Sequence, residues 1–367
     1  MAVYTAIDDP SAHFQIKLYT GNGSHPRNIT NDGNSNLKPD LIWTKNRTDN
    51  GTNHVITNSS VGFDAPNSNG GSNAGGQMST DSVGAENTPQ ATYGYISAHL
   101  TDGFTTAAGG TNGDTMNANS KEFVAYQWKV NGGTTSANTA GGINSTVQVN
   151  ATAGISIIKF TADGTTNTIG HGLGVKPDVV IFKSRNVGGG WLLITDKKNG
   201  SMDYAYMNSA DDWDDIGYDA NTSTLIQYND NNTNTQVALA FAEIQGYSKF
   251  GVYYGNGEST EGPFVYCGFK PAFVIIKNTQ TDARPWYMFD NARKTFNPNG
   301  LMLESNTTDA EATDQAIDMY SNGFKVRPGA LGSYGTSSIN HSAQYMFYMA
   351  FAESPFVSSE GTPTTAN

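Results

Sequence analysis

The stretch VKPDVVIFKSRN, residues 175–186, decides the fold of this chain, because it occurs in two further versions. They are LKPDLIWTKNR at 37–47 and FKPAFVIIKNT at 269–279. Proline fixes the backbone angle φ and donates no hydrogen bond, which a strand tolerates at its first position. The run that follows is apolar at both alternating positions, and strands buried on both faces have this pattern. We therefore predict three strands, the Lys-Pro strands, that are each covered on both faces.

Each Lys-Pro strand ends in a lysine followed by a polar residue, at Lys45, Lys183 and Lys277. We expect these lysines to return the chain to solvent. In the second and third copies a tryptophan-bearing stretch comes next, GWLLITD at 190–196 and PWYMFDN at 285–291. Its mixture of aromatic and β-branched residues predicts a further strand.

A turn motif precedes each Lys-Pro strand. It reads YTGNG at 19–23, FTADG at 160–164 and YYGNG at 253–257. Gly, Asn and Asp tolerate positive φ, which tight hairpin turns require. The residues before each turn are apolar strand formers, namely Ile16 to Tyr19, Ile155 to Phe160 and Phe250 to Tyr254.

A closing phrase ends each unit: EFVAYQWKVNG from 122, QVALAFAEIQG from 236 and YMFYMAFAES from 345. Both alternating faces of the last copy are apolar, which predicts a central strand or one that seals a module against its neighbour. Glu243 and Glu353 end this strand in copies two and three, where copy one has Lys129. We interpret the repeated carboxylate as a strand-end ion pair or hydrogen bond rather than a catalytic group.

The fixed order of these phrases, with variable spacing, indicates a duplicated fold with variable loops. We predict an all-β chain of three tandem antiparallel β-sandwich-like modules with long Gly/Asn/Ser/Thr-rich loops. The expected divisions are an N-terminal arm 1–12, module one 13–150 with a long surface loop 64–90, module two 151–250, module three 251–356 and a tail 357–367. Residues 131–154 form either a flexible linker or, through STVQVN, an extra strand. For 305–321 we expect one or two helical turns.

Composition and charge exclude several classes of function. Charged residues are only 15% of the 367, and the formal net charge is −12. No Lys/Arg-rich stripe occurs, so nucleic acid is not expected as a partner. No apolar run approaches the roughly 18 residues that span a bilayer, and the opening MAVYTAIDDP lacks the features of a secretory signal. We expect synthesis in a cytoplasm without membrane insertion.

Residues with recognisable chemistry are few. The six histidines are scattered, and no nucleophile-elbow, phosphate-loop or dinucleotide motif is present. We therefore predict no enzymatic activity and no cofactor or metal. The single cysteine, Cys267, lies in the apolar run PFVYCGF and is expected to be buried.

One loop is a candidate contact site. In SADDWDDIGYD, residues 209–219, four aspartates surround a tryptophan. Clustered carboxylates can hold Ca²⁺, but this spacing is not that of an EF-hand, and a solvated loop is the favoured interpretation. Loop aromatics are good contact anchors, so the loop and nearby tyrosines are predicted to contact a host glycan or protein. The set is Tyr204, Tyr206, Asp211, Asp212, Trp213, Asp214, Asp215 and Tyr218.

The phrase set and the connector GYSKFGVYYGNGESTEGPFVYCGFKPAFVIIKNT (246–279) resemble repeat-containing virion proteins of marine tailed bacteriophages, usually described as tail fibre or minor structural proteins. The resemblance covers about 14 to 356 and is tightest over 236 to 356, whereas copy one departs from it with a long loop and YQWK in place of AFAE. It implies a virion component on the particle surface, released by lysis, with other virion proteins as partners. The tail-fibre label implies host attachment and a homotrimer, but no binding residue carries over.

Three functional hypotheses follow. The first is a tail fibre or receptor-binding subunit. The second is a decoration or head-fibre protein on the capsid surface. The third is a tailspike-like glycan hydrolase, for which a groove with two convergent carboxylates would be the distinguishing feature.

Overall fold

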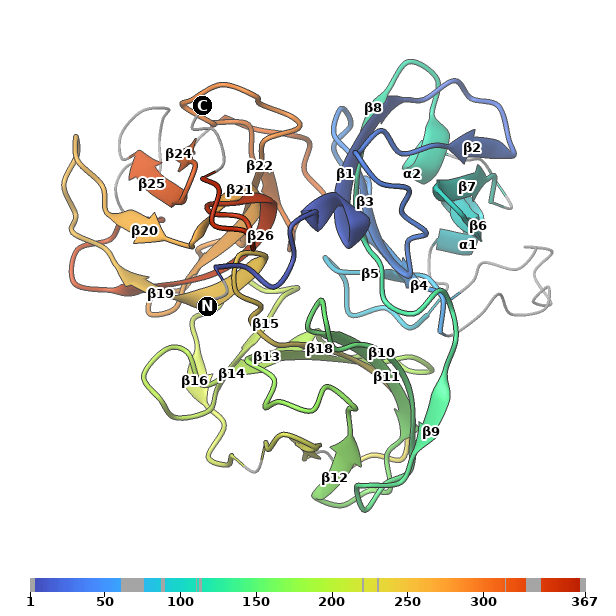
Figure 1. The fold of residues 1–367 in the computed structure, drawn as a ribbon. Coiled ribbons are helices and arrows are strands. Elements are labelled where there is room, and N and C mark those ends of the chain that lie inside the picture. The colour runs from blue at the N-terminus through green and yellow to red at the C-terminus, as the bar shows by residue number, and fades with distance from the viewer. Residues whose placement is uncertain are drawn as a thin grey trace.

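The three Lys-Pro strands each lie inside a separate antiparallel sheet in the computed structural model (Figure 1). They are β3 (Leu41–Asn46), β13 (Val179–Ser184) and β21 (Phe269–Asn278). The structure describes residues 4–60, 76–86, 90–109, 111, 114–219, 221–229, 231–313, 315–327 and 338–363. Within these ranges the chain is nearly all β, and no helix is long and apolar enough to cross a membrane.

The three large sheets share one strand order, so the sequence repeat is also a structural repeat. In each sheet the closing-phrase strand lies between the turn-motif strand and the Lys-Pro strand, and two further strands follow on the other side. The first sheet is β1 (Phe14–Thr20), β8 (Glu122–Trp128), β3, β4 (Val55–Asn58) and β5 (Met78–Ser79). The middle sheet contains β11 (Ile155–Thr161), β18 (Thr235–Phe241), β13, β14 (Leu192–Thr195) and β15 (Asp203–Tyr206). The third is β19 (Ser248–Tyr254), β26 (Tyr345–Pro355), β21, β22 (Tyr287–Asp290) and β23 (Leu303–Glu304).

A smaller sheet packs on the outer face of each large one and completes a sandwich. The outer sheets are β2 (Arg27–Ile29), β7 (Gly103–Ala107) and β6 (Tyr95–Leu100); β12 (Asn167–Gly170) and β17 (Leu225–Tyr228); and β20 (Phe264–Tyr266), β25 (Gly323–Arg327) and β24 (Ala316–Tyr320). We name the units the first, middle and third sandwich. The predicted fold class, all-β with antiparallel sandwich-like modules, is confirmed.

The alternating side chains of the Lys-Pro strands face two different cores, as the apolar pattern predicts. In β21, Val274 and Ile276 pack inside the third sandwich, whereas Phe273 and Ile275 face a central core. In β13, Ile181 faces the central core and Phe182 faces the interior of the middle sandwich. Figure 1 shows the result: the three sandwiches surround a common centre. Burial on both faces of these strands is therefore confirmed.

The central core joins all three sandwiches through aromatic side chains. Phe351 of the third sandwich contacts Phe14 and Trp128 of the first, at ring-centroid distances of 5.4 and 5.5 Å. It also lies 6.0 Å from Phe241 of the middle sandwich. Such pairs bury large apolar surfaces and hold neighbouring units in fixed geometry. The three sandwiches therefore share one core and are not independent domains joined by linkers.

The segment between the first two modules belongs to the middle sheet. Strands β9 (Ser136–Asn138) and β10 (Ser145–Asn150) pair with each other, and β10 pairs with β11 along its whole length. With β16 (Asp214–Asp215) at the opposite edge, the middle sheet has eight strands. Of the two alternatives for residues 131–154, the extra strand is the correct one. The boundary expected after residue 150 instead separates two strands of one hairpin.

The helix expected within 305–321 is absent from the described part of that segment. The chain runs as a loop to residue 313 and then enters β24. Ile317 and Met319 of β24 pack inside the third sandwich, so tertiary burial decides the conformation where helix propensity is weak. The helices that are described are short: η1 (Pro10–Ala12), α1 (Gln90–Tyr93) and α2 (Asp114–Asn117).

The expected surface loop 64–90 is only partly described, since 64–75 and 87–89 lie outside the described residues. Residues 76–80 are buried, because β5 extends the first sheet by pairing with β4. A surface position is therefore wrong for this part. Cys267 is buried as predicted, and burial raises the pKa of its thiol to about 12.

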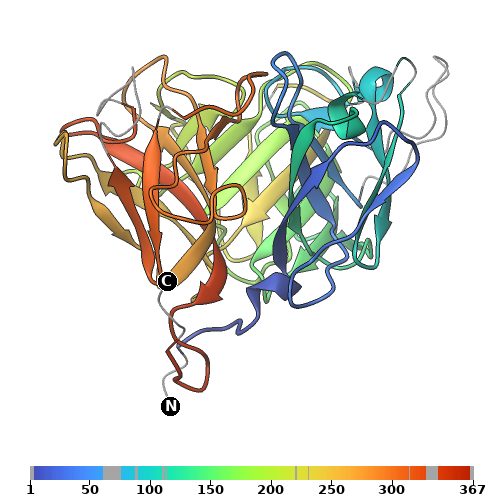
Figure 2. The same ribbon diagram turned by 90° about the horizontal axis from the view of Figure 1, so that it is seen from above.

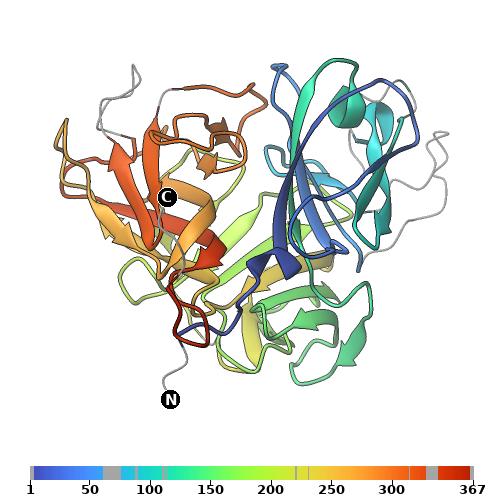
Figure 3. The same ribbon diagram turned by 45° about the horizontal axis from the view of Figure 1, so that its top comes forward.

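The N-terminal arm and the C-terminal tail run side by side at one end of the molecule (Figures 2 and 3). The backbone N–H of Ser359 donates to Asp8 Oδ1 at 2.7 Å. The backbone N–H of Ala6 donates to Gln245 O at 3.1 Å, which ties the arm to the end of the middle sandwich. The described parts of both segments are thus anchored to the body.

Candidate ligand-binding site

The three lysines that end the Lys-Pro strands are buried, so the expectation that they return the chain to solvent is wrong. Lys45, Lys183 and Lys277 are between 0% and 1% exposed. Each ammonium group donates to a backbone carbonyl oxygen in a loop of a neighbouring sandwich. The distances are 3.1 Å from Lys45 Nζ to Thr308 O, 3.5 Å from Lys183 Nζ to Val83 O and 2.9 Å from Lys277 Nζ to Ala210 O.

Backbone hydrogen bonds repeat the same connection in each interface. The carbonyl oxygens of Thr308, Val83 and Ala210 also accept from the N–H groups of Gly51 (2.9 Å), Gly189 (2.8 Å) and Arg284 (3.2 Å). Three residues further along each loop, an N–H group donates back: Glu311 to Arg47 O, Glu86 to Arg185 O and Trp213 to Thr279 O. The first sandwich thus extends a loop onto the middle one, the middle onto the third and the third onto the first. We name this arrangement the loop ring.

The acidic loop 209–219 is the middle sandwich's contribution to the loop ring. Trp213 occupies the position that Glu86 and Glu311 have in the other two loops, where ion pairs form with Arg185 (2.6 Å) and Arg47 (2.9 Å). Trp213 is 5% exposed and packs against Phe347 with ring centroids 4.8 Å apart. Its predicted role as an accessible contact residue is therefore wrong, because its ring fills an interface inside the molecule.

The four aspartates of this loop are exposed. Partial loss of solvent around the Asp212 carboxyl and the nearby negative charge of Asp282 raise the pKa of this carboxyl. The backbone N–H of Asp212 donates to Asp282 Oδ1 at 3.0 Å. Asp214 and Asp215 form the edge strand β16. Among the residues that the structure describes, no three His, Cys, Asp or Glu side chains come together as a possible metal site. The loop's described contacts are thus structural.

Two of the predicted tyrosines, Tyr206 and Tyr218, line one pocket in the middle sandwich. The pocket has a volume of about 250 Å³. Tyr206 is 42% exposed. Tyr204 does not line the pocket, but its ring packs edge-on against Tyr206 at 5.9 Å and supports that ring from the side. The structure therefore brings Tyr206 and Tyr218 together and assigns Tyr204 a supporting position.

The glycine turn at residues 188–190 contacts the Tyr206 ring and fixes its position. A Cβ atom added to Gly190 would lie 2.4 Å from Tyr206 Cδ1, whereas one added to Gly189 would lie 3.7 Å from Ser184 Cβ, an ordinary contact. Only a residue without a side chain at 190 lets the tyrosine ring rest on the turn. The run of three glycines before Trp191 is thus a local cause of the pocket's shape.

The pocket is also lined by Tyr228 and by a set of amide side chains that sequence analysis missed. The Tyr228 ring is fixed by Phe160 and Phe182, at centroid distances of 4.9 and 5.3 Å. Asn232 Nδ2 donates to Tyr228 Oη at 3.4 Å, and Gln236 Nε2 donates to Asn232 Oδ1 at 3.4 Å. The amides are Asn229, Asn232, Asn234 and Gln236. The Asn-rich run beside a strand was the available signal.

The pocket presents aromatic faces and amide groups with little charge. Lys183 lines it, but the ammonium group is held by Ser184 O at 3.0 Å and Val83 O. Burial lowers the pKa of Lys183 to about 8. Ser184 Oγ is buried and has no hydrogen-bond partner among the described residues. These long or missing hydrogen bonds leave donors and acceptors that a ligand with several hydroxyl groups can satisfy.

The repeated glutamates at the ends of the closing strands make the predicted ion pairs. Glu243 Oε2 lies 2.7 Å from Lys249 Nζ, and Glu353 Oε2 lies 2.9 Å from Lys270 Nζ. The structural interpretation of this repeated carboxylate is therefore confirmed.

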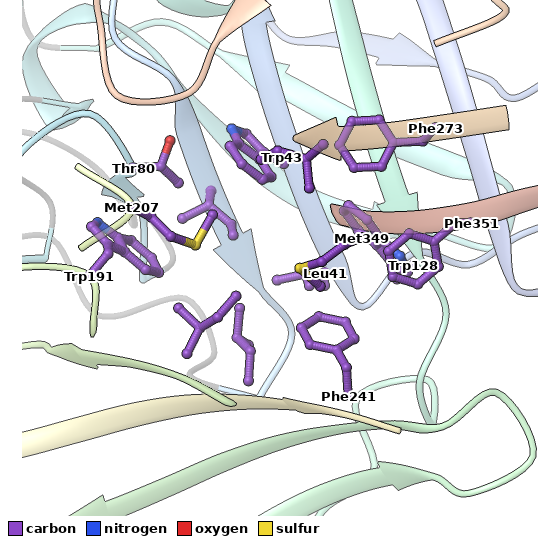
Figure 4. Close-up of a pocket in the computed structure, with 14 residues that line it drawn as sticks. Leu41, Trp43, Thr80, Trp128, Trp191, Met207, Phe241, Phe273, Met349 and Phe351 are labelled. Atoms are coloured by element: carbon purple, nitrogen blue, oxygen red, sulfur yellow. The ribbon is translucent and has the colours of Figure 1, made fainter. Parts of the chain in front are cut away.

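A cavity at the centre of the molecule is part of the packing (Figure 4). Its volume is about 30 Å³, close to the space of a single water molecule. Its walls are aromatic and aliphatic side chains from all three sandwiches, among them Trp43, Trp191 and Phe351. We attribute it to imperfect packing where three sheets meet, and not to ligand binding.

The fold and pocket define a class: an all-β protein in which three interlocked sandwiches share one core and one sandwich carries a tyrosine- and amide-lined pocket. Residues 9–355 match the family described as "Domain of unknown function (DUF7483)", and the chain belongs to this family. No curated protein and no solved structure matches the chain.

Proposed function

We propose that this protein is a bacteriophage virion structural protein, a tail fibre or receptor-binding subunit at the virion surface that mediates host attachment, and that the middle-sandwich pocket contacts a host surface glycan. The observation that carries the proposal is the half-exposed Tyr206 ring beside a wall of uncharged amides. An amphipathic ring on a rigid support gives contact area at low entropic cost, and amides match hydroxyl groups. A neutral pyranose fits this chemistry.

The rigid scaffold supports a binding role. Tyr206 lies on β15, and the glycine turn beneath it is held by the loop ring through Gly189. Binding groups on rigid elements lose little freedom when a ligand binds. The resemblance to phage virion proteins adds the biological setting, with other virion proteins as partners and a homotrimer as the proposed assembly.

Two experiments test this proposal. Purified protein should bind cells of the bacterial host, and Tyr206→Ala and Tyr218→Ala should each reduce that binding at least about tenfold, the typical effect of removing an interface anchor. Tyr254→Ala, at an exposed tyrosine of the third sandwich, is the matched control. Wild-type binding by both pocket variants would overturn the glycan contact.

Labelled antibody on intact particles tests the location. A few to some tens of copies at the tail support attachment, whereas many tens to hundreds on the head support the second candidate, a capsid decoration or head-fibre protein. The second candidate is kept because the three sandwiches surround one centre without an elongated shaft in the described residues (Figure 1).

The hydrolase hypothesis is weaker on chemical grounds. A hollow between the first and third sandwiches is lined by Asp32 and Glu353. Each is held in an ion pair, with Lys17 at 2.8 Å and Lys270 at 2.9 Å. A glycosidase needs one carboxyl group that carries a proton, and a neighbouring ammonium group favours the ionised form. The pairing favours binding over hydrolysis, and an assay for new reducing ends on host polysaccharide tests it.

A further inference from the structure

A second cleft lies in the third sandwich. It is at the start of the Lys-Pro strand β21, beside Lys270, whereas the tyrosine pocket is at the end of the Lys-Pro strand β13, beside Lys183. The loop after β22 and the near ends of β21 and β26 enclose a volume of about 240 Å³. The residues that matter to the argument are Lys294, Phe296 and Asn299 on the loop, and Lys270 and Glu353 at the strand ends.

Hydrogen bonds from its Nδ2 to two backbone carbonyl oxygens hold the Asn299 amide in place, and its Oδ1 is left without a donor. Asn299 is 1% exposed, and its Nδ2 donates to Asp290 O at 2.6 Å and to Lys294 O at 3.3 Å. Asn299 Oδ1 is buried and has no hydrogen-bond partner among the described residues. An unpartnered buried acceptor is costly in a folded protein, so one that lines a cleft indicates a missing donor.

The rim of the cleft carries an aromatic ring and a cation. Phe296 is 78% exposed, the highest value among the large hydrophobic side chains that the structure describes. Lys294 is also exposed, and its ammonium group forms no ion pair within the described residues. The ring and the ammonium offer a ligand an apolar contact and a charged contact on the same loop.

The corresponding loop of the middle sandwich provides an internal comparison. There the residues after β14 include Lys197 and Lys198, whose ammonium groups pair with Asp178 at 2.6 Å and Asp203 at 3.0 Å. Counted from Trp191 and Trp286, the third sandwich has Arg293 at the position of Lys198, and Arg293 pairs with Asp290 and Glu311. Lys294 is the next residue along the loop, is exposed and forms no ion pair within the described residues, so it is available to an anion.

The cleft adjoins a second hollow. A neighbouring hollow of about 160 Å³ shares Asn291 and Glu353 with it and extends to Gln15 of the first sandwich. Between the two hollows the Glu353 carboxylate is neutralised by Lys270 and accepts from Asn291 Nδ2. The floor of this groove is thus locally balanced in charge, and the Lys294 end is positive.

We propose that this groove binds an oligosaccharide that carries a uronate residue. One pyranose face rests on Phe296, a hydroxyl group donates to Asn299 Oδ1, and the sugar carboxylate pairs with Lys294. The site is separate from the tyrosine pocket, and the inference does not depend on where in a virion the protein sits.

The test uses purified full-length protein and matched ligands. Tetrasaccharides of galacturonate, glucuronate and mannuronate are titrated by calorimetry beside their methyl esters, which keep the shape and remove the charge. We expect at least one uronate to bind with Kd tighter than about 1 mM, and its ester to bind about tenfold more weakly. No binding by any uronate, or equal binding by an ester, would overturn the proposal.

Three variants locate the site. Lys294→Gln and Phe296→Ala should each weaken uronate binding about tenfold, because both positions are exposed and the fold tolerates them. Tyr206→Ala should leave it unchanged. If Tyr206→Ala abolishes uronate binding while the two groove variants do not, the ligand occupies the tyrosine pocket, and this inference fails while the proposed function stands. If the protein binds a uronate but not host cells, the proposed function fails and this inference stands.

Discussion

At the scale of single residues, Lys45, Lys183 and Lys277 are buried although their positions in the sequence predict exposure. Each follows an apolar strand, where a long charged side chain usually reaches solvent. Each has one acceptor nearby in the chain and one far away; Lys45, for example, donates to Thr52 O and to Thr308 O, which is 263 positions away. No local pattern shows such a partner. Only the repetition of lysine at the same place in all three copies indicated a structural role, which is the hydrogen bond to a loop of a neighbouring sandwich.

Replacing one of these lysines tests that role. Lys277→Met keeps the length of the side chain but removes the donors to Ala210 O and Arg284 O, at 2.9 and 2.7 Å. We expect the free energy of unfolding to fall by about 2 kcal/mol, the cost of leaving buried carbonyl groups unpaired. Urea denaturation measures it. Lys249→Met, at a half-exposed lysine, is the control and should change stability by less than about 1 kcal/mol.

The same lysines predict how stability depends on pH. Burial lowers the pKa of Lys45, Lys183 and Lys277 from 10.5 to about 8. Between these values the unfolded chain binds more protons than the folded one, so the free energy of unfolding rises with pH. We expect higher stability near pH 9.5 than near pH 7.5. At higher pH the gain reverses, because burial raises the pKa of Tyr19, Tyr247 and Tyr348 and folding then opposes their ionisation.

Denaturant midpoints measured at both pH values check this prediction. Lys183→Met should reduce the rise, since one of the three groups is then missing. A fall in stability over this interval would mean that the carbonyl oxygens stabilise the charged ammonium groups more than burial destabilises them.

At the scale of elements, the acidic loop 209–219 is an interface between two sandwiches rather than a free surface loop. Trp213 is an interface residue, packed 5.9 Å from Trp286 and 4.8 Å from Phe347. We expect Trp213→Ala to lower the free energy of unfolding by about 3–5 kcal/mol, because it leaves a cavity between two sandwiches. Asp214→Asn, at an exposed aspartate next to it, should change stability by about 0.5 kcal/mol at most. Thermal denaturation compares the two; equal effects would contradict the assignment.

The glycine turn offers a prediction about binding with a matched control. Gly190→Ala places a Cβ against the Tyr206 ring, whereas Gly189→Ala meets only an ordinary contact. We expect Gly190→Ala to weaken host-cell binding about as much as Tyr206→Ala and to leave the circular dichroism spectrum unchanged. Gly189→Ala should bind like the parent protein. Similar binding by both variants would show that the ring's position is not critical.

The elements themselves were largely predictable from sequence, and the site was only partly so. The alternation of Val274 and Ile276 with Phe273 and Ile275 predicts a strand between two apolar layers, and both layers exist. The identity of the second layer was not predictable, because it is built from two other sandwiches. Tyr206 and Tyr218 were found as aromatics near a loop, but the amides that line the same pocket come from a segment that only the fold brings near.

At the scale of the whole molecule, the shared core predicts cooperative unfolding. Side chains from all three large sheets belong to one hydrophobic cluster, and each sandwich also holds a loop of another. We expect one calorimetric transition, with the calorimetric and van't Hoff enthalpies about equal. Three separate transitions would show that the sandwiches are independent domains. A fragment of residues 131–245, which includes β9 and β10, should be less stable than the same sandwich in the intact chain, because its central face would be exposed to water.

The loop ring also orders the events of biosynthesis. Its first two contacts can form as the middle and third sandwiches leave the ribosome, but Arg47 must wait for Glu311, 264 positions later. Contacts so distant along the chain form slowly, since a long loop must close before they contribute. The first sandwich is therefore made early and completed last, once the third sandwich has been synthesised.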